Sequence, residues 1–211
     1  MSPLLASIGA LRSADSCARL SVWHISAYFI GAQSAVQILG LDRAGDTVVL
    51  EEFAGVLGKK FKGGGTEYQT IWLQAPSPKA SAEMFLDEWQ SHLTNRKFST
   101  SVEASTPSTR VIDLTAKLPS LETKPRLYFA TPDITYLRAW FDGVYFVANC
   151  CSGVRVQPDI QAFQHWLRGA VAPSASCPWE MLLISACGGD ACLGFSRFFE
   201  ELRRFTSVGQ S

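Results

Sequence analysis

One stretch, residues 126–151, constrains the fold more than any other part of this chain. It reads RLYFATPDITYLRAWFDGVYFVANCC and is the densest run of apolar and aromatic residues in the sequence. The pair Asp142 and Gly143 divides it. A two-residue Asp-Gly connection is typical of a tight β-hairpin, because Gly accepts a positive φ freely. The pattern therefore predicts a central hairpin, and its apolar residues on both faces predict cover on both sides.

Several shorter segments also resemble strands. Residues 36–42 and 47–54 flank a glycine-containing turn and predict a hairpin. Residues 20–30 carry both a helical and an alternating pattern, and the hairpin that follows favours a strand. The remaining expected strands are residues 68–74, 98–103 and 110–114, the last two forming a second hairpin or a linker.

Amphipathic helices are predicted where apolar residues recur at three- and four-residue steps. The clearest spans residues 193–205, with phenylalanines on one side and charged residues on the other. Residues 179–186 fit a strand and a buried helix equally, because a short apolar run has no distinguishing period. The other expected helices are residues 4–11, 81–93 and 158–170.

Together these elements predict an α+β fold, a mostly antiparallel sheet with amphipathic helices packed on it. The chain of 211 residues is long enough for a single compact unit, residues 1–211, or for two αβ lobes divided near residues 104–125. Residues 20–41 carry no charge and raise the question of a membrane span. His24 and Gln37 would be costly in hydrocarbon, so we expect a buried core segment there instead.

The charge balance argues against some partners. The chain has 19 basic and 19 acidic residues, a formal net charge of zero. Because nothing in that balance attracts a polyanion over long range, neither nucleic acid nor a membrane is an expected partner. Near-neutral chains rich in aromatic residues associate readily, which favours a partner protein or a homo-oligomer. Six cysteines without a recognisable export signal favour reduced thiols and a cytoplasmic location; in a periplasmic protein Cys177 could pair with Cys187 or Cys192.

Catalytic motifs are weak in this sequence. The glycine-rich segment 58–66 lacks the Gly-x4-Gly-Lys-Ser/Thr spacing with which a loop cradles phosphate. The cysteines and histidines do not form the two closely spaced pairs of a structural zinc site. We therefore expect no cofactor and no metal. The one catalytic alternative is a thiol nucleophile, Cys150 or Cys151, with His165 as its base.

Two groups of residues are predicted to bind a partner. The first belongs to the expected hairpin and comprises Tyr136, Arg138, Trp140 and Tyr145. Aromatic residues and Arg dominate the energetics of protein interfaces, so this face would bind wherever the chain's own helices leave it open. The second group is a basic loop that suits an acidic partner and comprises Lys59, Lys60 and Lys62.

These observations favour binding over catalysis. We expect a soluble, non-catalytic module that binds another protein, in the manner of a stoichiometric inhibitor such as a bacterial immunity protein. Two alternatives stay open. One is a hydrolase or transferase that uses Cys150 or Cys151 with His165. The other is a structural subunit that buries the aromatic hairpin in an oligomer.

Overall fold

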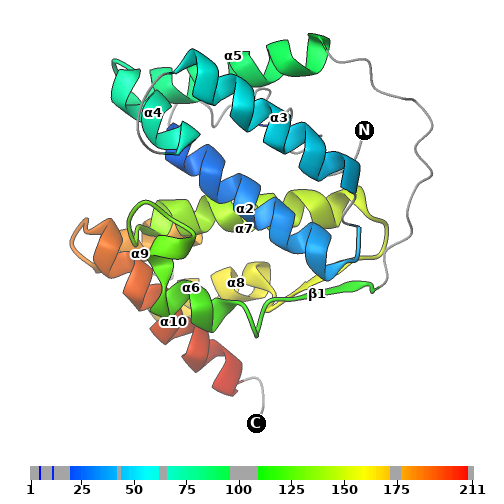
Figure 1. The fold of residues 1–211 in the computed structure, drawn as a ribbon. Helices are drawn as coiled ribbons and strands as arrows, with labels where there is room; N and C mark the ends of the chain where they lie inside the picture. Colours follow the sequence, from blue (N-terminus) through cyan, green and yellow to red (C-terminus); the bar gives the residue numbers. More distant parts are fainter. Residues whose placement is uncertain are drawn as a thin grey trace.

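The fold is mostly helical (Figure 1). The computed structural model describes residues 5, 11, 20–41, 44–61, 66–95, 109–171 and 177–208. Of these, 75 % are helical and 4 % lie in strands, so the prediction of an α+β fold with a mostly antiparallel sheet is wrong. The elements in chain order are α2 (Val22–Ile38), α3 (Ala44–Lys60), α4 (Glu67–Gln74), α5 (Pro78–Asn95), β1 (Val111–Asp113), α6 (Leu118–Thr123), η2 (Pro125–Leu127), α7 (Ile134–Cys150), β2 (Arg155–Gln157), α8 (Ile160–Val171), α9 (Trp179–Ala186) and α10 (Ala191–Val208).

Two helices, α2 and α7, form the centre of the molecule. They lie side by side and run in the same direction (Figure 1). Their backbones touch at two glycines. A Cβ atom on Gly31 would overlap the carbonyl oxygen of Trp140, and one on Gly143 would overlap the carbonyl oxygen of Tyr28. Only glycine fits these positions, because any side chain would push the two helices apart.

The hairpin predicted at residues 126–151 is replaced by the single helix α7. Asp133 begins it, since its carboxylate accepts a hydrogen bond from the backbone N–H of Thr135 at 2.7 Å. Asp142 and Gly143 lie inside the helix, and Gly143 lacks the positive φ that a hairpin turn requires. Nine of the 17 residues of α7 are buried, and the helix contacts α2, α9 and α10. Its only charged residues, Arg138 and Asp142, form a narrow polar stripe, which is too short to show the helical period clearly in so apolar a run.

The other predicted strands of the first half are helical too. Residues 22–30 of the first segment and residues 36–38 of the second belong to α2, and the helix ends before Gly40, whose φ is 65°. Residue 42 lies outside the described residues. Residues 47–54 lie within α3, so the hairpin predicted there is absent. The segment 68–74 is α4, which Thr66 caps by accepting the Gln69 N–H at 3.3 Å. In residues 20–39, the helical spacing of the apolar residues therefore predicted the structure correctly, and their alternation did not.

Helix predictions with a clear polar side are confirmed. The segments 81–93, 158–170 and 193–205 correspond to α5, α8 and α10. The ambiguous segment 179–186 is the helix α9. Of the helix predicted at residues 4–11, Leu5 and Leu11 are helical and the rest lies outside the described residues.

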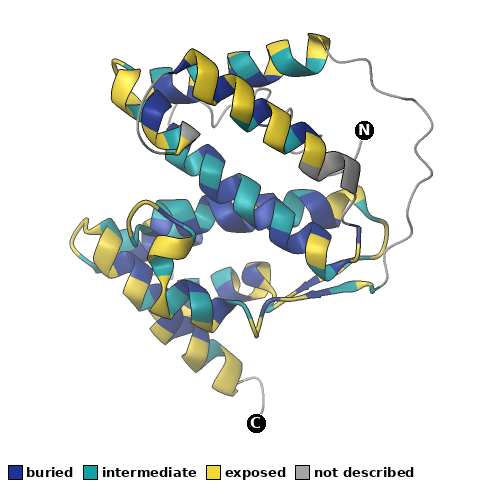
Figure 2. Cartoon of the chain, viewed as in Figure 1, coloured by how far each residue is buried: buried dark blue, intermediate teal, exposed yellow. Residues whose placement is uncertain are grey.

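The core lies on both sides of the α2–α7 pair, and Figure 2 shows the buried residues gathered along these two helices. Above them, α3 and α5 meet through aromatic rings: Phe53 lies 5.4 Å from Phe85 and 4.8 Å from Trp89, centroid to centroid. Below them, α8, α9 and α10 close around Phe198, whose ring lies 5.4 Å from Phe163 and 4.9 Å from Trp179. The upper layer packs on α2, through α4 and α5, and the lower layer packs on α7, through α9 and α10.

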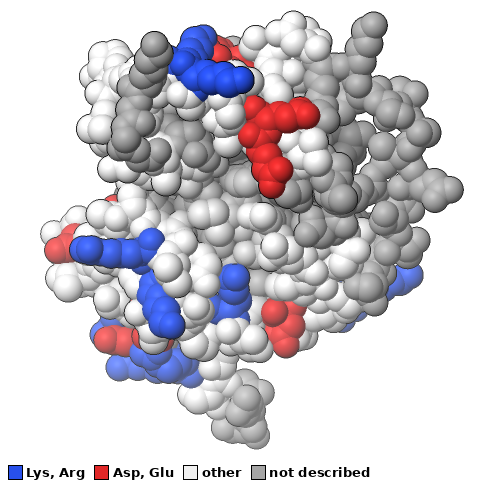
Figure 3. Space-filling view, viewed as in Figure 1, with Lys and Arg blue, Asp and Glu red and all other residues white. Residues whose placement is uncertain are grey.

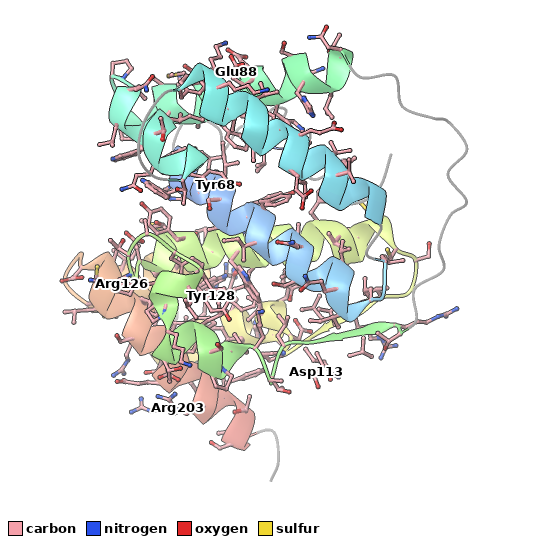
Figure 4. All side chains as sticks on the ribbon, viewed as in Figure 1. Tyr68, Glu88, Asp113, Arg126, Tyr128 and Arg203 are labelled. Atoms are coloured by element: carbon pink, nitrogen blue, oxygen red, sulfur yellow. The ribbon has the colours of Figure 1, made fainter. Side chains whose placement is uncertain are left out.

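A short parallel pair, β1 and β2, is the only sheet within the described residues. Ile112 pairs with Val156, and the chain between the strands passes through α6, η2 and α7. The strand predicted at residues 110–114 is thus confirmed, although its partner is β2; the segment 98–103 lies outside the described residues. Asp113 closes β1 by accepting a hydrogen bond from the backbone N–H of Thr115 at 2.9 Å (Figure 4).

The uncharged segment 20–41 packs within the protein, with nine of the 17 residues of α2 buried. None of the described helices is by itself long and apolar enough to cross a membrane. Only α9 and α10 taken together reach that length and hydropathy, and a bend of 111° separates them.

Candidate functional site

The helix α7 separates the four residues predicted to share one binding face. Trp140 is fully buried in the core. Tyr136 packs edge-on against the ring of His24, with 4.7 Å between the ring centroids. Arg138 and Tyr145 are seven residues apart, two helical turns, so they lie on the same side of α7 and line a common cleft.

The cleft has a volume of about 650 Å³ and opens between α7, β2, the first half of α8 and the start of α9. This volume lies in the range of ligand-binding pockets in proteins. Its charged lining comprises Arg138, Asp142, Arg155 and Asp159, and four side-chain amides and the Tyr145 hydroxyl add further polar groups. Phe141 and Trp179 contribute to the apolar part of the wall. The wall of the cleft therefore combines apolar surface with neutral hydrogen-bonding groups and with charges of both signs.

At one end of the cleft, a single guanidinium serves two carboxylates. Arg138 Nε donates to Asp142 Oδ1 at 2.8 Å, and Arg138 Nη1 donates to Glu180 Oε2 at 3.1 Å. The Asp142 side chain is 47 % exposed and the Glu180 side chain 14 %, so water reaches one carboxylate through the cleft and hardly reaches the other. With one positive charge against two negative charges, this end of the cleft has a surplus carboxylate.

The pKa values of this group agree with an incompletely paired site. Burial raises the pKa of Asp142 above its usual range, the negative charge of Glu180 raises it further, and the attraction of Arg138 does not offset the two. Burial alone would lower the pKa of Arg138, but Asp142 and Glu180 together raise it. Asp142 is open to water and still strongly affected by burial because protein atoms surround it on the walls of the cleft.

On the β2 side of the cleft the charge imbalance is the opposite one, because the positive charge of Arg155 has no negative partner in the described part of the chain. Arg155 is exposed and lines the cleft. Next along the cleft, Asp159 is engaged with α8: its Oδ1 accepts the backbone N–H groups of Gln161 at 2.9 Å and Ala162 at 3.1 Å. The cleft thus presents one unpaired cation and, near Arg138, one surplus anion.

Tyr145 joins the two walls of the cleft. Its hydroxyl oxygen accepts the backbone N–H of Ile160 at 3.1 Å, which ties α7 to the start of α8. Burial is the largest cause of a raised pKa for Tyr145, so the phenol keeps its proton. That proton remains for donation, because the recorded hydrogen bond uses only the oxygen as an acceptor.

A second polar group joins the first turns of α2 and α7. Ser21 N–H donates to His24 Nδ1 at 3.2 Å, which leaves the proton of the neutral imidazole on Nε2. His24 Nε2 then donates to Thr135 Oγ1 at 3.1 Å, and Thr135 Oγ1 donates to Asp133 Oδ1 at 2.6 Å. Burial lowers the pKa of His24, and the nearby charge of Asp133 only partly opposes it. We interpret this chain of hydrogen bonds as a structural junction held by a neutral histidine.

The cysteine alternative gains no geometric support. Cys150 is exposed and Cys151 partly so at the end of α7, while His165 is exposed on α8. Burial is the largest cause of a raised pKa for both thiols, which disfavours the thiolate needed for attack. No hydrogen bond joins His165 to either thiol in the described part of the chain.

The predicted basic loop is only partly described. Lys59 is exposed at the end of α3. Lys60 forms an ion pair with Glu88 of α5, and Lys62 lies outside the described residues. On the face shown in Figure 3, basic and acidic side chains occur in small separate groups, some of a single sign, rather than in one large patch.

Sequence reasoning missed the role of two cleft residues. Asp142 was interpreted as a turn residue, although its four-residue spacing from Arg138 is that of an ion pair on one helix. Arg155 was not singled out, because no local pattern marks a residue of a three-residue strand. Among the described residues, no group of three or more His, Cys, Asp or Glu could hold a metal ion.

Comparison with known proteins identifies no relative. No protein-family model, curated protein or solved structure matches this chain.

Proposed function

We propose that this chain acts by binding another protein, without catalysis, and that the cleft between α7, β2, α8 and α9 receives the partner. The observation that carries the proposal is the complementary charge imbalance of the cleft. Arg138 is shared by Asp142 and Glu180, whereas Arg155 has no acidic partner in the described part of the chain. A partner that supplies the missing charges would gain both affinity and a defined orientation.

The simplest role for such a surface is that of a stoichiometric inhibitor. Neutralising a partner requires only that its surface be occupied, and needs no activated nucleophile or metal. The raised thiol pKa values of Cys150 and Cys151 favour this role over thiol catalysis.

Photo-cross-linking from neighbouring positions of α8 tests the proposal. Gln164 lines the cleft, whereas its neighbour His165 is exposed and does not. A benzophenone amino acid at position 164 should capture one protein from the native host, and the same residue at position 165 should not. Arg155→Glu in the position-164 variant should abolish capture, because it reverses the unpaired charge. Equal capture from both positions, or capture that ignores Arg155→Glu, would contradict the proposal.

A further inference from the structure

The strand β2 has one free edge. Arg155 N–H donates to the carbonyl of Arg110 at 2.8 Å, and Leu114 N–H donates to the carbonyl of Gln157 at 2.8 Å. The backbone groups of Arg155 and Gln157 therefore point toward β1. Successive residues of a strand direct their N–H and C=O groups to opposite edges, so those of Val156 point away from β1. Neither group has a hydrogen-bond partner among the described residues.

This free edge belongs to the cleft, because residues 154–157 all contribute to its lining. β1 pairs with the other edge of β2. Val156 as a whole residue is 8 % exposed, so only a small area of it, backbone included, reaches the cleft. Pro158, which has no N–H, follows β2 and ends the edge. The cleft thus offers an unpaired backbone donor and acceptor next to Arg155, in addition to the surplus carboxylate of α7.

We propose that the partner enters the cleft as an extended segment and adds a third strand to the free edge of β2. Strand addition of this kind obtains affinity from main-chain hydrogen bonds and specificity from alternate side chains. The proposal rests on the proposed function and specifies how the partner is held. The segment should carry an acidic residue for Arg155 and a basic residue for Asp142 and Glu180, because a segment of one sign would leave one of these charges unpaired.

A second copy of this chain is a poorer occupant. An edge strand can pair with another edge strand in principle. Here, however, β2 lies inside a concave site, and the β2 of a second copy would lie inside a concave site of its own. Two recessed edges cannot approach each other as closely as a flexible segment can approach one of them.

The first experiment selects ligands from a phage-displayed library of random heptapeptides on the intact protein. The charge-reversed variant Arg155→Glu/Asp142→Lys serves for counter-selection. We expect enriched peptides that lack proline and contain both an acidic and a basic residue. Failure to enrich any peptide over the charge-reversed variant overturns both the strand addition and the cleft as the binding site. Enriched peptides of a single charge sign overturn the requirement for both charges.

The second experiment places an N-methyl group on each amide of one enriched synthetic peptide in turn. In a bound strand, only every second amide faces β2, and the acceptor established as free on this edge is the C=O of Val156. A methyl group on the one peptide amide that donates to this C=O should weaken binding about fivefold or more, the effect expected for one hydrogen bond. Methyl groups on the two neighbouring amides, which face away from β2, serve as matched controls. Equal losses at these three positions, or no loss at any position, overturn strand addition and leave the proposed function standing.

The third experiment removes the donor from the protein. Replacing Val156 by its α-hydroxy acid analogue turns the N–H into an ester oxygen and keeps the side chain. Because this N–H has no partner in the described part of the chain, its loss should not itself lower stability, and only the weaker ester carbonyl of Arg155, which faces β1, should lower it slightly. The peptide should bind about fivefold more weakly. In the wild type, the Val156 amide should exchange with deuterium quickly alone and slowly with the peptide bound. Unchanged affinity or unchanged exchange contradicts strand addition. A concentration-dependent dimer that the ester variant abolishes would instead identify a second copy as the occupant.

Discussion

The two sides of α7 differ in how closely the protein surrounds them. Toward α2, Gly143 lets two backbones touch, and no side chain fits between them. Toward α8 and β2, Arg138, Asp142 and Tyr145 line about 650 Å³ of open cleft. The first side leaves no room, and the second leaves charges incompletely paired. One helix therefore packs without a gap on one side and lines the candidate binding cleft on the other, so substitutions on the packed side should change stability more than substitutions on the cleft side.

The largest expected effect is on the packed side. Gly143→Ala places a Cβ atom on the carbonyl oxygen of Tyr28, and backbone cannot move away as a side chain can. We expect a loss of about 3 kcal/mol in the free energy of unfolding, measured by urea denaturation. Gly31→Ala should behave similarly against Trp140.

The matched control for this prediction is Gly55→Ala in the middle of α3. A Cβ atom on Gly55 meets nothing within 4 Å. Because alanine is the better helix former, this variant should gain about 0.5–1 kcal/mol. Equal effects at positions 55 and 143 would show that the helices α2 and α7 are not held by backbone contact.

A smaller effect is expected on the cleft side. Arg138→Met leaves Glu180, which is 14 % exposed, without its cation, and should cost about 1.5 kcal/mol in unfolding free energy. The added substitution Glu180→Gln should recover part of that loss, because it removes the unpaired charge. Arg203→Met serves as control: its ion pair with Glu122 is exposed, and its loss should cost less than about 0.5 kcal/mol. Additive losses in the double variant would contradict coupling across the cleft.

The junction between the first turns of α2 and α7 should make stability depend on pH. The pKa of His24 is lowered in the folded state, so the unfolded chain binds this proton more readily. Its contribution to stability is therefore present above the unfolded pKa of 6.5 and is lost as the pH falls below that value. Between pH 7.5 and pH 5, His24→Gln should lose less stability than the wild type. Thermal unfolding over this range measures the difference, and parallel pH profiles would refute a titrating His24.

The smallest expected effect is in thiol reactivity. Because the pKa of Cys150 is raised, its alkylation at pH 7 should be slower than that of cysteine in an unfolded peptide, even though the side chain is exposed. His165→Gln should not change the rate. Mass spectrometry after timed iodoacetamide treatment measures it. A rate above that of the free peptide, lost in His165→Gln, would favour the hydrolase or transferase alternative.

The local sequence pattern predicted the helices that have one face exposed to solvent. α8 and α10 carry apolar residues at helical steps with polar residues opposite, and both were recognised. α2 carries no charged residue, and the only charged residues of α7 are Arg138 and Asp142, so the polar stripe that distinguishes a helix from a strand is absent or narrow in these helices. The pair Asp142 and Gly143 was also wrongly interpreted as a hairpin turn. Glycine is required at position 143 because the backbone of α2 touches it there.

The candidate site shows the same division. Arg138 and Tyr145 were predicted to bind, and they line the cleft, but Trp140 lies in the core and Tyr136 packs against His24. A strand would have placed 136, 138 and 140 on one face, whereas a helix unites 138, 142 and 145.

By itself, the sequence determined which segments are amphipathic helices, because the three- and four-residue spacing of their apolar residues marks the face that packs on the core. It also determined that residues 110–114 prefer an extended form. Only the tertiary structure decided that residues 134–150 are helical, because most of α7 is covered and its polar stripe is too narrow to establish the period. It alone brought Arg155 into the cleft that holds the ion pair of Arg138 and Asp142, since Arg155 reaches it from the neighbouring strand β2. Local sequence encodes exposure to solvent, whereas contact between distant segments depends on the shapes of both partners.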